Sequence, residues 1–154
     1  MTLTDTAAQG TGNELDNTID GSQVSNSLMG VAGYDMLYGN GGNDTLDGGE
    51  HDDTIDGGTG VDTVIYQNER IYYKVDYDAD SLSWIVTDAV GDQGDGVDEG
   101  VDYLTNVEYL SFSDQTIEAP RTTAPIHRTD SATADNVIQL SGVAPADCSD
   151  SVFG

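Results

Sequence analysis

A chain of 154 residues is long enough for one domain, or for one domain with a tail. Acidic residues outnumber basic ones 29 to 4, which gives a formal net charge of −25. A surface this negative repels phosphate backbones and anionic lipid headgroups, and it excludes nucleic acid as a partner. Modest hydrophobicity with charge of one sign is typical of disordered chains, so an ordered fold requires cations that neutralise the acids.

Neither a membrane helix nor a secretory signal peptide is evident. No apolar run is long enough to span a bilayer. Residues 1–10 lack both a basic region and an apolar core, and residues 1–11 are expected to form a flexible N-terminus.

From Gly12 onward, a nine-residue period runs through the sequence. Glycine opens each unit, Asn or Asp occupies the sixth position, and an aliphatic residue occupies the eighth. The period holds without a slip through six units. The opening glycines are Gly12, Gly21, Gly30, Gly39, Gly48 and Gly57, and the eighth residues are Ile19, Leu28, Leu37, Leu46, Ile55 and Val64.

Each unit is expected to form a six-residue turn followed by a short strand. Glycine permits positive φ in the turn, and strand alternation points the eighth residue inward. Two units then make one coil of eighteen residues, and coils stack at the spacing of sheet strands, about 4.8 Å. The period therefore predicts an all-β fold, a parallel β-roll of roughly three coils over residues 12–65.

The pattern resembles the G-G-x-G-x-D-x-U-x repeat of the RTX, or hemolysin-type, calcium-binding proteins. Units 39–47, 48–56 and 57–65 match it best, and the first two units are degenerate. The resemblance implies a right-handed roll with Ca²⁺ as its cofactor. It also implies the type I secretion machinery as a partner and an extracellular location, where calcium would fold a chain that leaves the cell unfolded.

Stacking places the sixth-position residues of alternate units on the same edge of the roll. Two unit charges at about 4 Å repel by about 4 kcal/mol at an effective dielectric of 20, and residues 1–69 contain no Lys or Arg. Calcium, which takes six to eight oxygen ligands, suits such a position. One edge would carry Asn17, Asp35 and Asp53, and the other Asn26, Asp44 and Asp62.

The candidate ligands differ in strength. We expect firm sites between Asp35 and Asp53 and between Asp44 and Asp62, where both sides carry a carboxylate. Weaker sites would pair an asparagine with an aspartate, because the amide keeps the oxygen but loses the charge. Turn carbonyls would complete each coordination shell, with Gly33, Gly42 and Gly60 as the candidate glycines.

Residues 66–118 are predicted to form a β-rich flank with an antiparallel hairpin, which in the family caps the roll. The hairpin joins residues 71–77 to 84–87, and residues 103–114 read as one or two more strands. Its turn, Asp76 to Asp80, resembles the start of an EF-hand loop, but a polar turn is favoured because no helices flank it.

Three groups of side chains in the repeats and flank have competing interpretations. The aromatic residues Tyr72, Tyr73, Tyr77 and Trp84 are expected in the core, with a glycan platform as the alternative. Acidic residues within 92–102 are expected to form a solvated loop, with an additional ion site as the alternative. His51 is expected to be a tolerated turn residue.

Residues 119–154 are rich in Pro, Thr, Ser and Asp and are expected to form a flexible tail or a secretion signal ending at 150–154. Residues 135–142 within it resemble half a repeat. Cys148 is the only cysteine, so no intramolecular disulfide is possible.

The preferred function is a calcium-binding module that folds after type I secretion, with an upstream domain or larger assembly as a possible context. The alternative is a stand-alone structural or adhesion protein. No catalytic function is expected, because a nucleophile–base pair is hard to assemble from two histidines and one remote cysteine.

Overall fold

The computed structural model describes residues 1–4, 8–90 and 98–120. Its elements are β-strands and one 3-10 helix, η1 (Arg70–Tyr72), and the strands form two six-stranded sheets. One sheet contains, in order, β1 (Gln9–Thr11), β3 (Ser27–Ala32), β5 (Thr45–Glu50), β7 (Thr63–Ile65), β11 (Tyr109–Ser111) and β12 (Thr116–Glu118). The other contains, in order, β2 (Thr18–Asp20), β4 (Met36–Tyr38), β6 (Thr54–Asp56), β10 (Val101–Thr105), β9 (Ser83–Asp88) and β8 (Tyr73–Asp78).

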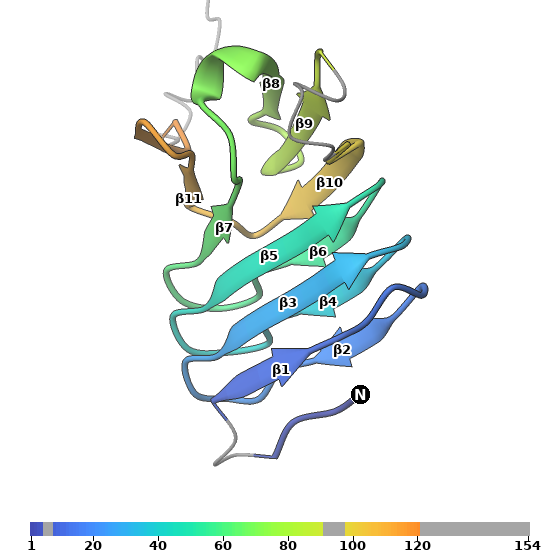
Figure 1. The fold of residues 1–154 in the computed structure, drawn as a ribbon. Helices are drawn as coiled ribbons and strands as arrows, with labels where there is room; N and C mark the ends of the chain where they lie inside the picture. Colours follow the sequence, from blue (N-terminus) through green and yellow to red (C-terminus); the bar gives the residue numbers. More distant parts are fainter. Residues whose placement is uncertain (5–7, 91–97, 121–154) are drawn as a thin grey trace, which may run out of the picture. The chain divides into compact units, whose positions relative to one another are not determined.

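The repeats coil as the nine-residue period predicts. Strands from alternate repeats pair in parallel, β2 with β4 and β4 with β6 in one sheet, and β3 with β5 in the other. Paired residues lie eighteen positions apart, as Ile19 and Leu37 do. Two nonapeptides therefore complete one coil, and the coils stack into the parallel β-roll of Figure 1. The predicted fold class is confirmed.

The core is a column of eighth-position side chains between the two sheets. All six are at most 1% exposed, because alternation along each strand turns them away from solvent. Each fully buried aliphatic side chain contributes about 1.5–3 kcal/mol. The column consists of Ile19, Leu28, Leu37, Leu46, Ile55 and Val64, and Leu104 and Leu110 of the flank join the same cluster.

The flank continues both sheets of the roll. β10 pairs in parallel with β6, and β11 pairs in parallel with β7. The hairpin of β8 and β9 then joins β10 in antiparallel fashion, and β12 joins β11. The predicted hairpin is thus confirmed, and its turn places a hydrogen bond between Ser81 Oγ and Asp78 Oδ2 at 2.7 Å.

The aromatic residues of the flank pack inward. Tyr73 and Trp84 are each 4% exposed, and Tyr72 and Tyr77 are partly buried against the same core. Trp84 Nε1 donates to the carbonyl of Val107 at 3.0 Å, which anchors the hairpin to the segment between β10 and β11. The core interpretation of this aromatic group is therefore correct.

The start of the chain differs from the flexible segment expected at 1–11. Within its described part, β1 pairs with β3, and Thr2 forms a parallel bridge with Asp20. Gly10 lies opposite Leu28, so the eighteen-residue register extends upstream of the first repeat. The repeat motif does not reveal this because Gly10 stands where an aliphatic residue would mark the register.

Several expectations concern residues outside the described ranges. They are the tail beyond residue 120, the half-repeat at 135–142, Cys148, and the signal at 150–154.

Candidate calcium sites

Two ladders of hydrogen bonds run along the edges of the roll. In each step, the backbone N–H of a sixth-position residue donates to the side chain of its counterpart eighteen residues later. On one edge Asn17 donates to Asp35 at 2.7 Å, and Asp35 to Asp53 at 2.8 Å. On the other edge Asn26 donates to Asp44 at 2.7 Å, and Asp44 to Asp62 at 2.8 Å. The structure thus brings the predicted ligands together in the predicted order.

Each ladder aspartate keeps one carboxylate oxygen without a partner. The four aspartates of the repeats are at most 2% exposed. Their Oδ2 atoms are buried and accept no hydrogen bond. Leaving a buried charged oxygen unsatisfied costs more than the 1–3 kcal/mol of a neutral group. The four unpartnered oxygens, which fit a hard cation, belong to Asp35, Asp44, Asp53 and Asp62.

The opening glycines make room for these oxygens. A Cβ added at Gly30 would lie within 3.0 Å of both Asp35 Oδ2 and the carbonyl oxygen of Gly48 in the next coil. The same pair of oxygens recurs above Gly39, where Asp44 Oδ2 meets the carbonyl oxygen of Gly57. Carboxylate and carbonyl oxygens therefore gather at one recurring point, and they are the ligand types that calcium takes in proteins.

Burial makes the ladder carboxylates hard to ionise without a cation. It raises the pKa of Asp53 to about 7, and the negative charge of Asp35 adds to the rise. Burial also raises the pKa of Asp62 to about 6, with smaller contributions from Asp44 and Glu108. The pKa values of Asp35 and Asp44 are raised for the same main reason.

The turns of repeats three to six have a common backbone shape. Their second and fourth residues all have positive φ, which exposes turn carbonyls to the neighbouring coil. The fourth position holds the predicted glycines Gly33, Gly42 and Gly60, and His51 takes it in repeat five with φ of 80°. His51 is exposed, and its ring centroid lies 5.8 Å from that of Tyr34.

Backbone carbonyls would have to supply most of each coordination shell. In the part of the chain that the structure describes, no three His, Cys, Asp or Glu side chains are grouped to hold a metal ion. A pair of aspartates on one edge offers two carboxylates, whereas calcium takes six to eight oxygens. The ligand roles of Gly33, Gly42 and Gly60 and of the six sixth-position residues stay predictions.

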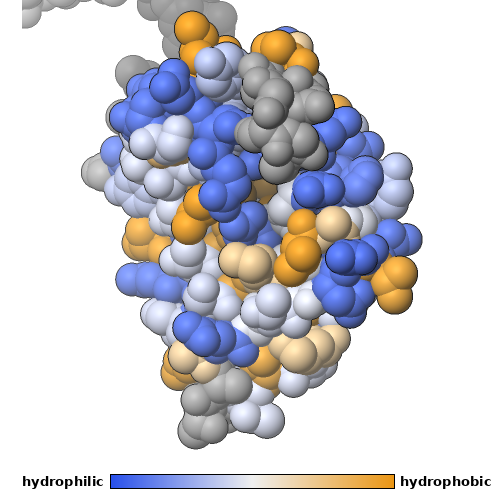
Figure 2. All heavy atoms as spheres, viewed as in Figure 1, coloured by the Kyte–Doolittle hydropathy of each residue, from blue (hydrophilic) through white to orange (hydrophobic). Residues whose placement is uncertain are grey.

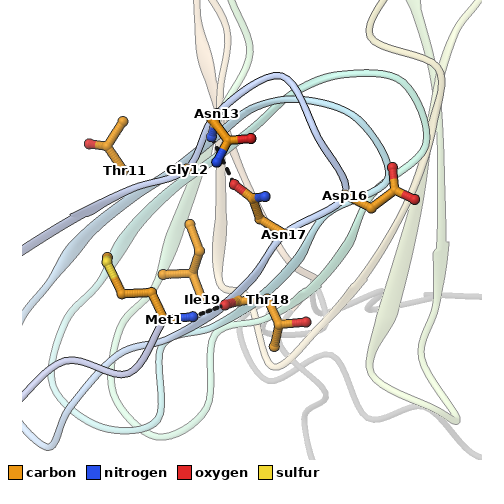
Figure 3. Close-up of a pocket in the computed structure, with 8 residues that line it drawn as sticks. All are labelled: Met1, Thr11, Gly12, Asn13, Asp16, Asn17, Thr18 and Ile19. Atoms are coloured by element: carbon orange, nitrogen blue, oxygen red, sulfur yellow. Dashed lines mark hydrogen bonds between the residues drawn. The ribbon is translucent and has the colours of Figure 1, made fainter.

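The two asparagines differ from the aspartates that follow them. Asn17 Oδ1 accepts the backbone N–H of Asn13 at 2.8 Å, as Figure 3 shows, and Asn26 Oδ1 accepts that of Ser22 at 2.6 Å. Their turns are closed by these hydrogen bonds and have no positive φ at the second or fourth position. An open pocket of about 330 Å³ beside Asn17 therefore borders an amide oxygen that already has a partner.

Sequence reasoning missed two further members of the ladders. Asp53 N–H donates to Asp102 Oδ1 at 2.9 Å, and Asp62 N–H donates to Glu108 Oε2 at 2.8 Å. Both acceptors lie in the flank, outside the nine-residue period. The spacing from Asp102 to Leu104, equal to that from sixth to eighth position in a repeat, was the available signal.

The expectation of a solvated acidic loop at 92–102 is wrong for its last residues. Glu99 is 4% exposed and Asp102 is 2% exposed, because the chain folds back over the fifth repeat. Tyr66 donates its hydroxyl to Asp102 Oδ2 at 2.9 Å, and Tyr73 donates to Glu99. Burial raises the pKa of Glu99, and it raises the pKa of Asp102 strongly. Asp95 lies outside the described residues.

On the face in Figure 2, hydrophobic residues are scattered among hydrophilic ones. Among the described residues no helix is long and apolar enough to cross a membrane.

This fold and its ladders define a class: β-rolls built from nonapeptide repeats with a ladder of carboxylate and amide side chains on each edge. Residues 29–64 match the family model described as RTX calcium-binding nonapeptide repeat, in four copies. The segment is therefore an RTX repeat array, and the chain carries a calcium-binding β-roll module.

Solved structures similar to this chain include one of a secreted enzyme. The chain is similar to the extracellular lipase LipA from Serratia marcescens, with 21% sequence identity and a TM-score of 0.34. The similarity covers 67% of this chain and 14% of the lipase chain. No curated protein sequence matches the chain.

Proposed function

We propose that this chain is a module whose folding is gated by calcium and which folds outside the cell after type I secretion. The observation that carries the proposal is the set of four buried, unpartnered carboxylate oxygens in Asp35, Asp44, Asp53 and Asp62. These groups destabilise the roll when they are ionised and uncompensated. Bound calcium would supply the compensating charge, so binding free energy would become folding free energy.

The side chains of the roll set the conditions under which it folds. The opening glycines hold the aspartate oxygens close to turn carbonyls, and the ladder hydrogen bonds keep successive coils in register. The hydrophobic column is only one aliphatic side chain thick per repeat. Ordering nine residues costs on the order of 9–18 kcal/mol of backbone entropy, so a cation-dependent contribution is needed.

Secretion is supported by the type of repeat that residues 29–64 match. Extracellular calcium modules bind with dissociation constants of about 10⁻⁴–10⁻³ M, well above cytosolic calcium levels. A module of this type would stay unfolded in the cytosol and fold outside. That the chain is not an enzyme also stays a prediction.

The first test is far-UV circular dichroism during a calcium titration, with magnesium as the control ion. We expect a cooperative gain of β signal near millimolar calcium and little gain with magnesium, which dehydrates reluctantly and demands octahedral geometry. A full β signal in chelator would contradict the proposal.

Asp53→Asn tests the ladder directly. The substitution keeps the size of the side chain and removes the charge. We expect the calcium midpoint to rise roughly tenfold or more, because a charge-assisted contact is worth about 1.5–3 kcal/mol and 1.4 kcal/mol is tenfold. Asp80→Asn, at an exposed position in the hairpin turn, should leave the midpoint unchanged.

Secretion needs a separate experiment. Cells exporting the chain by type I secretion would be grown in calcium-rich and calcium-depleted media. We expect folded, protease-resistant protein only in the calcium-rich medium, and equal accumulation in both would refute extracellular calcium gating.

A further inference from the structure

The flank contains a fourth coil of the roll that the repeat motif does not reveal. β10 and β11 pair in parallel with β6 and β7, as earlier coils pair with one another. Leu104 lies opposite Ile55, and Leu110 opposite Val64, so both occupy eighth positions and both are fully buried. The hairpin of β8 and β9 interrupts the sequence between the third and fourth coils, and this breaks the nine-residue period.

Backbone geometry in the fourth coil follows the repeats. The register places Gly100 and Asn106 at fourth positions, and both have positive φ, 65° and 53°. Tyr103 N–H donates to the carbonyl of Asp53 at 2.9 Å, the same contact that Thr54 N–H makes with Asp35. The turn from Thr105 to Glu108 is shorter than a repeat turn. Thr105 lies opposite Asp56, the last residue of repeat five, and the following residue, Asn106, already corresponds to Gly60, the fourth residue of repeat six.

At the edge of Asp62, the fourth coil reproduces the oxygen arrangement of the repeats. Asp62 Oδ2 is buried and unpartnered, and Asp62 N–H donates to Glu108 Oε2 at 2.8 Å. A Cβ added at Gly57 would lie within 3.0 Å of both Asp62 Oδ2 and the carbonyl oxygen of Asn106. Asn106 thus stands where the repeats have the glycine carbonyl of the next coil.

The other edge of this coil is finished differently. Asp102 Oδ1 accepts the N–H of Asp53, and its Oδ2 accepts the hydroxyl of Tyr66 at 2.9 Å. A neutral donor therefore fills the position that is unpartnered in the repeat aspartates. The Asp62 edge has no such donor to Oδ2.

We propose that Asp62, Glu108 and the carbonyl oxygen of Asn106 form a divalent-cation site, suited to calcium, that joins the last repeat to the flank. The proposal rests on the calcium-binding function proposed above for the repeats. Glutamate takes the sixth position here, and its Oε2 accepts the N–H of Asp62 as Oδ1 of Asp62 accepts the N–H of Asp44. The site makes docking of the flank depend on the same ion as the roll.

The test is to count calcium ions in the full chain by native mass spectrometry and to titrate calcium by calorimetry. Glu108→Gln keeps an oxygen that accepts the N–H of Asp62 but removes the charge. We expect this variant to bind one ion fewer than the wild type. Glu69→Gln, an exposed charge change in the same flank, should bind the wild-type number.

A shorter carboxylate provides a second readout if Glu108→Gln fails to fold. Glu108→Asp keeps the charge, but the shorter side chain places the carboxylate farther from the proposed ion. We therefore expect at least a several-fold weaker affinity for one ion. Fluorescence of Trp84, the single tryptophan, reports whether the flank has docked.

The outcomes separate this site from the repeat sites. Wild-type ion number and affinity in both Glu108 variants, with calcium binding otherwise intact, would overturn this site alone. No calcium binding by the wild type would overturn it together with the proposed function.

Discussion

At the sixth position of a repeat, one oxygen atom distinguishes a turn that closes on itself from a turn that needs a cation. Asn17 and Asn26 turn their Oδ1 atoms back to an N–H of their own repeat. The aspartates of later repeats leave Oδ2 buried without a donor. In the degenerate first coil, the side-chain oxygen at the sixth position is therefore satisfied by the protein alone.

The raised carboxylate pKa values predict how the calcium-free chain responds to pH. The folded pKa of Asp53 is about 7 and that of Asp62 is about 6, both above the ordinary value of 3.8. Their contribution to folding is therefore fully present below about pH 4 and is lost as the pH rises through 6 and 7. We expect the metal-depleted chain to resist urea better at about pH 5 than at about pH 7.5.

Urea unfolding followed by circular dichroism in metal-depleted buffer would measure this. Relief of the general negative charge acts in the same direction, so the double variant Asp53→Asn, Asp62→Asn is needed. Its pH dependence should be flatter than that of Asp80→Asn. A chain that is more stable at the higher pH would contradict the argument.

At the level of the element, the turn depends on positive φ at its fourth residue. Gly60 has φ of 142°, and a Cβ there would lie well inside 3.0 Å of the carbonyl oxygen of Gly42 in the coil below. We expect Gly60→Ala to destabilise the calcium-bound form by about 3 kcal/mol or more, because backbone strain and a backbone clash add.

Gly41→Ala is the matched control in the adjacent coil. Gly41 has no positive φ, and its nearest neighbour is the end of the flexible Gln23 side chain. We expect a change of about 1 kcal/mol or less, read from thermal unfolding in saturating calcium. Equal losses in the two variants would show that turn crowding, and not φ, limits these positions.

The nine-residue period explains how much of the roll can be predicted from sequence. Because the positions of the glycine, the Asn or Asp and the aliphatic residue never slip from Gly12 to Val64, the pairing of Ile19 with Leu37 and the order of both ladders follow directly. The fourth coil cannot be found in this way, since the hairpin lies between Val64 and Leu104. Its members are identified by register only after the strands are paired.

For the part of the chain that the structure describes, the fourth coil joins the roll and the flank in one buried cluster, and we expect the two to unfold as one cooperative unit. Leu104 is fully buried on β10, opposite Ile55 of the repeats and Trp84 of the hairpin. Replacing it leaves a cavity that both parts border. We expect Leu104→Ala to cost about 2–5 kcal/mol and to raise the calcium midpoint of folding.

Cooperativity is read from two probes of the same titration. Circular dichroism follows the β content of the roll, and Trp84 fluorescence follows the flank. In Leu104→Ala both midpoints should move together, whereas Leu15→Ala, at a 70% exposed position, should move neither. If only the fluorescence midpoint moved, the roll would fold without its fourth coil, and calcium would control the repeats and the flank as separate units.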